Sequence, residues 1–238
     1  MLLKKILSLF VLVPSVLLLT CSSDEESPVS PTPKTDPPEF VLKEVTFPEK
    51  MQNSSDQMAK ETIERIHQTM SFEGTGCVFE APANSTAVTE TTSAWEYQWT
   101  EDQVTNSLKI TSTADRNMWQ IYFDGGSYSN WRYMDAVQRS DRTSGHVHLY
   151  RSSTSQIEHE WVWYTLENQE YKFIKQVYSD PNSKVEIAFK SDGSGKLETF
   201  LPGSGGSLVY ELRVSWDNEG NGSWWTFDDG TQTGSGTW

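Results

Sequence analysis

Three of the four histidines in this sequence lie close together, at positions 146, 148 and 159. If residues 152–155 form the loop of a β-hairpin, His148 lies opposite His159, and His146, two residues from His148, shares their face. Three imidazoles placed in this way can bind Zn²⁺ and leave a fourth position for a water molecule. The spacing therefore predicts a zinc site suited to a hydrolytic enzyme. The alternative is an ordinary strand surface, and a shift of one residue in register would remove the site.

Aromatic side chains form a second candidate site. All ten tryptophans lie from Trp95 onward, and this residue type is rarely fully buried and often contacts flat ligands such as sugar rings. We expect a surface that binds neutral glycans or a protein partner, with cross-strand packing as the alternative. The residues expected to carry this surface are Trp131, Tyr133, Trp161, Trp163, Trp224 and Trp225.

A third candidate is the acidic segment 217–222, followed by Asp228 at the twelfth position. Its spacing approximates an EF-hand calcium loop, but Glu219 and Asp228 replace the preferred residue types and no helices flank it. A glycine-rich hairpin turn explains the segment better. We therefore expect no cofactor, with zinc and calcium as alternatives, and a binding module rather than an enzyme.

The elements that carry these residues are short strands. From about residue 85 onward, apolar and polar residues alternate with period two, which predicts half-buried antiparallel strands in a meander. So long a sheet usually forms a barrel, a half-barrel around a helix, or a two-sheet sandwich, and a closed barrel would suit a carrier of hydrophobic ligands. The expected strands are 95–99, 104–113, 117–123, 129–137, 145–151, 157–165, 170–178, 184–190, 196–201, 208–216 and 222–228.

One helix precedes the strands, at about residues 55–70. Ser54 or Ser55 can cap it, with a glutamine three residues after Ser54 as in a capping box. The apolar residues on one of its faces are Met58, Ile63, Ile66 and Met70. The expected fold class is therefore all-β with one N-terminal α-helix, in a single domain over residues 48–238.

The N-terminus carries an export signal. Lys4 and Lys5 precede an apolar run that is too short and too interrupted to span a bilayer comfortably and that ends in Leu-Leu-Thr-Cys at residues 18–21. This arrangement resembles the signal peptide and lipobox of bacterial lipoproteins. The resemblance implies cleavage before Cys21, acylation of Cys21 and anchoring in the bilayer of the outer membrane. The acidic residues 22–26 resemble the export tag of surface lipoproteins in the Bacteroidota; alternatively, they simply begin a charged linker.

Composition completes these expectations. Residues 1–20 form the signal peptide, and residues 21–47 form a disordered, proline-rich and acidic tether. The chain has 19 Lys and Arg against 33 Asp and Glu, a net charge of −14, which disfavours nucleic-acid binding. After acylation of Cys21 only Cys77 remains, which we expect to be a small buried residue rather than a nucleophile. The chain is thus expected to be a lipid-anchored binding module, with a hydrophobic-ligand carrier or a zinc hydrolase as alternatives.

Overall fold

The structure is a computed structural model that describes residues 35–152 and 154–238. The predicted signal peptide, the lipidation site Cys21 and the acidic residues 22–26 lie outside the described residues. In the part of the chain that is described, no helix is long and apolar enough to cross a membrane.

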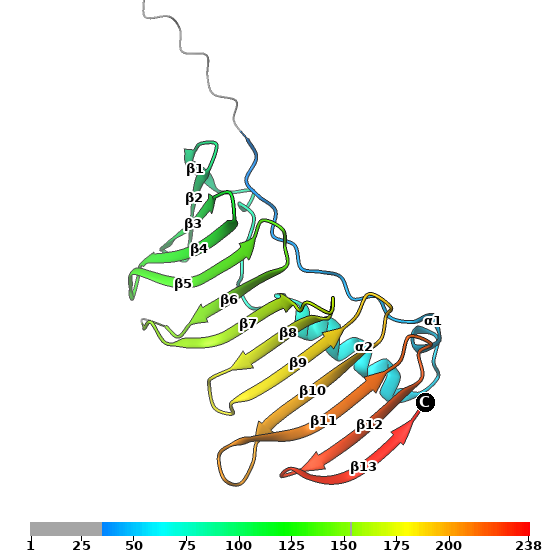
Figure 1. Ribbon diagram of the computed structural model, residues 1–238. Helices are drawn as coiled ribbons and strands as arrows, with labels where there is room; N and C mark the ends of the chain where they lie inside the picture. Colours follow the sequence, from blue (N-terminus) through cyan, green and yellow to red (C-terminus); the bar gives the residue numbers. More distant parts are fainter. Residues whose placement is uncertain (1–34, 153) are drawn as a thin grey trace, which may run out of the picture. The chain divides into compact units, whose positions relative to one another are not determined.

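Thirteen strands form one antiparallel sheet in which each strand pairs with its neighbours in sequence (Figure 1). The strands are β1 Thr86–Glu90, β2 Ala94–Glu101, β3 Val104–Ser112, β4 Arg116–Gly125, β5 Tyr128–Arg139, β6 Ser144–Tyr150, β7 Ile157–Thr165, β8 Tyr171–Val177, β9 Ser183–Phe189, β10 Gly195–Pro202, β11 Leu208–Trp216, β12 Gly222–Asp228 and β13 Thr231–Thr237.

The predicted all-β meander is confirmed, and its sheet is open. The strand order runs from β1 to β13, so these two strands are the edges of a single sheet. The barrel and sandwich alternatives are therefore wrong, and an open sheet with a helix on one face is nearest to the predicted half-barrel. Neither edge strand was expected as a separate strand, because both are short, polar and mostly exposed and lack an apolar alternation.

Two helices precede the sheet, α1 at Glu49–Gln52 and α2 at Gln57–Met70. The predicted helix is α2, but its cap is Asp56 rather than a serine. The Asp56 carboxylate accepts hydrogen bonds from the backbone N–H groups of Met58 and Ala59, at 2.8 and 3.3 Å. These bonds satisfy amide donors that the first turn of any helix leaves free.

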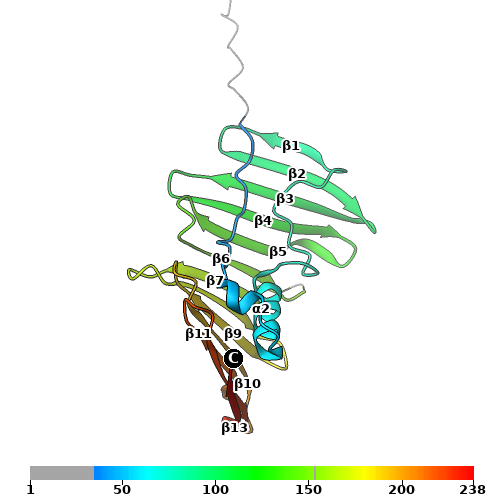
Figure 2. The same ribbon diagram turned by 90° about the vertical axis from the view of Figure 1, so that its right-hand side faces the viewer.

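Residues 35–85 lie against one face of the sheet, which we call the covered face (Figures 1 and 2). Phe40 makes edge-to-face contacts with Trp119 and Trp163, with ring centroids 5.3 and 5.6 Å apart. The Gln138 amide donates to the carbonyl oxygen of Val41 at 2.6 Å. The predicted tether over residues 21–47 is therefore too long, because its second half packs on the sheet as part of the core.

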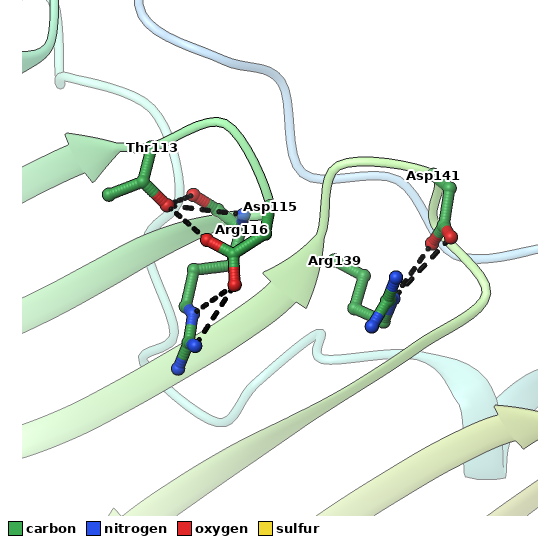
Figure 3. Close-up of polar contacts among 5 residues, drawn as sticks. All are labelled: Thr113, Asp115, Arg116, Arg139 and Asp141. Carbon is green, nitrogen blue, oxygen red and sulfur yellow. Dashed lines mark hydrogen bonds and ion pairs between the residues drawn. The ribbon is translucent and has the colours of Figure 1, made fainter.

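Side-chain hydrogen bonds close the turns that set the strand register (Figure 3). In the turn after β3, the Thr113 hydroxyl donates to Asp115 at 2.8 Å. In the turn between β5 and β6, the Arg139 guanidinium donates to Asp141 at 3.3 Å. Hydrogen bonds from Thr143, followed by that from Arg139, lower the pKa of Asp141 to about 2. The β5–β6 turn thus keeps these bonds at neutral pH, and β5 and β6 carry the residues described next.

Candidate functional site

The three predicted zinc ligands do not share one face of the sheet. The expected register holds only at the loop, where Tyr150 pairs with Ile157, and a β-bulge at Glu158 then shifts the pairing by one residue. His159 consequently pairs with Leu149 on the covered face. A slip of one residue turns every following side chain to the opposite face, so the prediction for His159 is wrong.

His159 instead belongs to the packing of the covered face. Its ring stacks on Trp161 at a centroid distance of 5.8 Å. Burial lowers the pKa of His159 and so favours its neutral form. Its Nδ1 atom is buried and has no hydrogen-bond partner among the described residues. These surroundings separate it from His146 and His148, which lie on the other side of the sheet.

His146 and His148 lie together on that side, which we call the open face, and they meet Asp135. Asp135 pairs directly with His148 across β5 and β6. The Asp135 carboxylate lies 3.5 Å from Nε2 of His146 and 3.8 Å from Nδ1 of His148, and the two imidazole rings stack at 4.3 Å. We call Asp135, His146 and His148 the His–Asp cluster. Asp135 gave no sequence signal, because only the register of the β5–β6 hairpin brings it to the histidines.

Two tyrosines hold the carboxylates around this cluster. The hydroxyl of Tyr150 donates to Asp135, and the hydroxyl of Tyr178 donates to Glu160 at 2.7 Å. Burial and these hydrogen bonds raise the pKa of each phenol to about 12, so both remain donors at neutral pH. Glu160 in turn bonds to Nε2 of His148 at 2.9 Å. The cluster is therefore supported on two sides by fixed hydrogen bonds.

Asp135 stays ionised in this setting. Burial by itself would raise its pKa, but hydrogen bonds from His146 and Tyr150 and electrostatic interactions with His148 and Arg132 together lower it below its usual value. The Arg132 guanidinium also donates to the Tyr150 hydroxyl at 3.1 Å. The cluster thus presents a carboxylate at neutral pH, held by a line of polar side chains that ends at Arg132.

The six predicted aromatic residues do not form one surface. Trp161 and Trp163 are 0% and 1% exposed on the covered face, so the prediction that they bind a ligand is wrong. The Tyr133 hydroxyl donates a hydrogen bond to the carbonyl oxygen of Thr75, within residues 35–85 that cover this face. The physical reason is the same for all three: residues 35–85 use this face of the sheet as their core.

The two adjacent tryptophans of β12 point to opposite faces, as a strand requires. Trp224 pairs with Val214 and packs against the covered core. Trp225 pairs with Arg213 on the open face, where the guanidinium lies 5.9 Å from its ring centroid. Only Trp225 of this pair is therefore on the uncovered side, and it lies seven strands from Trp131 in the order of the sheet.

Trp131 is near the start of β5 and lines a pocket between the β4–β5 and β6–β7 turns. The pocket has a volume of about 720 Å³. The Trp131 ring stacks on Tyr128 at 5.0 Å, and its indole N–H donates to the carbonyl oxygen of Thr154 at 3.1 Å, which fixes the ring. The pocket is lined by Ser127, Ser129, Asn130, Trp131, Arg132, Tyr150, Thr154, Ser155 and Gln156. It is therefore a polar pocket with one indole in its wall.

The candidate calcium loop is a hairpin turn between β11 and β12. The Asp217 carboxylate accepts hydrogen bonds from the backbone N–H groups of Glu219 and Asn221, at 3.0 and 2.9 Å. Asp228 lies at the far end of β12, and a strand of this length separates the two carboxylates by roughly 20 Å. They cannot ligate the same ion, so the EF-hand interpretation is wrong and the preferred turn is confirmed.

No protein-family model matches the chain, and no curated protein matches it significantly. The site must therefore be interpreted from its own geometry.

Proposed function

We propose that this protein is a glycan-binding module and that the Trp131 pocket receives a neutral oligosaccharide. The observation that carries the proposal is the combination of a fixed indole with a polar wall. Trp131 is held by Tyr128 and Thr154, so its ring is already oriented before a ligand arrives. Aromatic rings bind the apolar faces of sugars, and surrounding hydroxyl and amide groups bind their hydroxyls.

The charge and size of the pocket support this class of ligand. Its volume lies within the range of small-molecule sites, and Arg132 is the one charged side chain in its described lining. The hydroxyl and amide groups of Ser129, Asn130 and Gln156 provide donors and acceptors without net charge. A ligand rich in hydroxyls and without a strong charge fits these groups. Binding should therefore depend little on salt.

The alternative of a hydrophobic-ligand carrier receives no support from the covered face. Phe40, Phe72 and Phe79 contact one another there, with ring centroids 3.9 to 5.6 Å apart. These rings occupy the apolar surface that a carried lipid would need.

A binding assay with a panel of neutral oligosaccharides tests the proposal. We expect at least one to bind and to change the tryptophan fluorescence, and Trp131→Ala to weaken that binding by at least about tenfold, or about 1.4 kcal/mol. The matched control is Trp225→Ala, which removes a half-buried tryptophan outside the pocket. Absence of binding by the folded wild type, or equal losses in the two variants, would reject the proposal.

We also propose that the module is anchored through acylated Cys21 at the outer membrane and faces the cell surface. The support for the anchor is the apolar run that ends in the lipobox-like residues 18–21, and the support for the cell surface is the acidic segment 22–26. In a bacterial host, the wild type should incorporate labelled palmitate, and Cys21→Ala should remain an unprocessed precursor. Protease accessibility in intact cells then distinguishes the cell surface from the periplasm. A wild type without label would contradict the anchor.

A further inference from the structure

We propose that the His–Asp cluster on the open face binds a divalent transition-metal ion, for which Zn²⁺ is the best match. The ligand atoms are Nε2 of His146, Nδ1 of His148 and one carboxylate oxygen of Asp135. Imidazole and carboxylate are the donors of many zinc sites that keep an open coordination position. This inference stands apart from the proposed glycan binding, because none of these three residues lines the Trp131 pocket.

The distances between the donor atoms fit one small ion. All three lie within 4.8 Å of one another. Nε2 of His146 is 3.5 Å from Oδ2 of Asp135, and Nδ1 of His148 is 3.8 Å from Oδ1 of the same carboxylate. Zinc bonds of about 2.0–2.1 Å in tetrahedral geometry place ligand atoms about 3.3 Å apart. Small side-chain rotations are therefore sufficient. The backbone positions are fixed, because Asp135 and His148 are cross-strand partners and His146 is two residues along β6.

The surrounding hydrogen bonds prepare the donors. The Glu160 carboxylate can only accept at Nε2 of His148, so in the neutral imidazole the proton is on Nε2 and the lone pair of Nδ1, on the side of Asp135, is free for an ion. A carboxylate behind a ligating histidine is the usual support of a zinc site and increases the basicity of the imidazole. Tyr178 fixes Glu160 by a 2.7 Å hydrogen bond. Tyr150 similarly donates to one oxygen of Asp135 and leaves the second oxygen for the ion.

The burial and the charge of the His–Asp cluster also suit a bound divalent ion. The side chains of Asp135, His148 and His146 are 14%, 18% and 33% exposed, so the cluster is partly desolvated but reachable from solvent. Two neutral imidazoles and one carboxylate leave a single positive charge on bound Zn²⁺, which nearby Glu160 balances. Three protein ligands leave a fourth position for water.

Calorimetric titration of the tag-free protein with zinc chloride tests the site. We expect one ion per chain, with His146→Gln and His148→Gln each weakening binding at least 100-fold. Glu160→Gln should weaken it about tenfold, as loss of a supporting carboxylate does. The control His67→Gln changes an exposed histidine on α2 and should bind as the wild type does. The proposal would be overturned if the wild type bound no zinc up to 1 mM, which corresponds to a binding free energy weaker than about 4 kcal/mol. It would also be overturned if His67→Gln weakened binding as much as His148→Gln.

A second measurement on the wild type does not depend on the folding of any variant. The chain has four histidines, so their imidazole signals can be resolved by nuclear magnetic resonance. Zinc should shift the signals of His146 and His148 and leave those of His67 and His159 in place. Shifts of His67 or His159 with unchanged cluster signals would overturn the site. Sugar is absent from both experiments, so their outcome is separate from that of glycan binding.

Discussion

Gly195 provides a sharp test of how tightly the covered face is packed. It pairs with Trp216 across β10 and β11, and the indole of Trp216 lies directly against it. A β-carbon at position 195 would lie 2.5 Å from Cζ2 of Trp216 and 2.7 Å from the backbone oxygen of Ala188. The indole cannot move aside freely, because its N–H donates to the carbonyl oxygen of Gly193 at 2.7 Å. Gly195→Ala must therefore displace either a fixed ring or the backbone of β9.

The expected cost follows from two opposing effects. Overpacking of a filled core costs up to about 3 kcal/mol, and both obstacles at Gly195 are rigid. Replacing a glycine by alanine within a strand stabilises the folded state by about 0.5–1 kcal/mol, because alanine lowers the conformational entropy of the unfolded chain. The net loss in the free energy of unfolding is therefore about 2 kcal/mol. For a domain of this size, that loss lowers the melting temperature by about 4–8 °C.

Urea unfolding followed by circular dichroism measures this change directly. The matched control is Gly205→Ala in the β10–β11 turn, where a β-carbon meets nothing within 4 Å. Its free energy of unfolding should stay within about 0.5 kcal/mol of the wild type. If Gly195→Ala proves as stable as Gly205→Ala, the close approach of Trp216 to β10 is incorrect.

Three further predictions concern other parts of the described chain. Phe40→Ala should lower the free energy of unfolding by about 3 kcal/mol in urea, because Phe40 packs on Trp163, and no loss would mean that residues 35–47 are a tether after all. Asp56→Ala should cost about 1 kcal/mol in the same assay, since it removes the cap of α2; an unchanged stability would contradict the cap. Burial raises the pKa of Cys77 to about 11, so with Cys21→Ser in place its thiol should react about 200-fold more slowly at pH 8 than free cysteine. The same shift makes the protein lose stability as the pH rises from about 8.5 to 11, and a fast reaction of Cys77 would contradict both expectations.

The strand pattern was predictable from sequence because alternation is local. The bounds of β7 and β12 match the expected 157–165 and 222–228 residue for residue. Register is not local, since one extra residue at Glu158 sends His159 to the covered face. The predicted His146 and His148 pair is confirmed as one face of β6, whereas its partner Asp135 depends on pairing between strands. The His–Asp cluster could therefore be predicted only in part.

The packing of residues 35–47 on the sheet was not predicted, for a different reason. Prolines 37 and 38 favoured a tether, although Phe40, Leu42 and Phe47 that follow are apolar and pack on the sheet. That apolar run was the available signal. Once this segment covers one face, the buried positions of Trp161 and Trp163 follow, because the sheet needs large side chains to fill the space against Phe40 and Phe72. Trp131 is not buried in this way, because it is near the start of β5, beside the β4–β5 turn.

The most direct test of the central claim follows the ten indole N–H signals by nuclear magnetic resonance while a neutral oligosaccharide that binds is added. Trp131→Phe identifies the signal of Trp131 by its loss. We predict that the Trp131 signal shifts in proportion to bound sugar, because its ring lines the pocket, while those of buried Trp161 and Trp163 remain in place. Saturating binding that moves other indole signals and leaves Trp131 unchanged would contradict the claim that this pocket is the binding site.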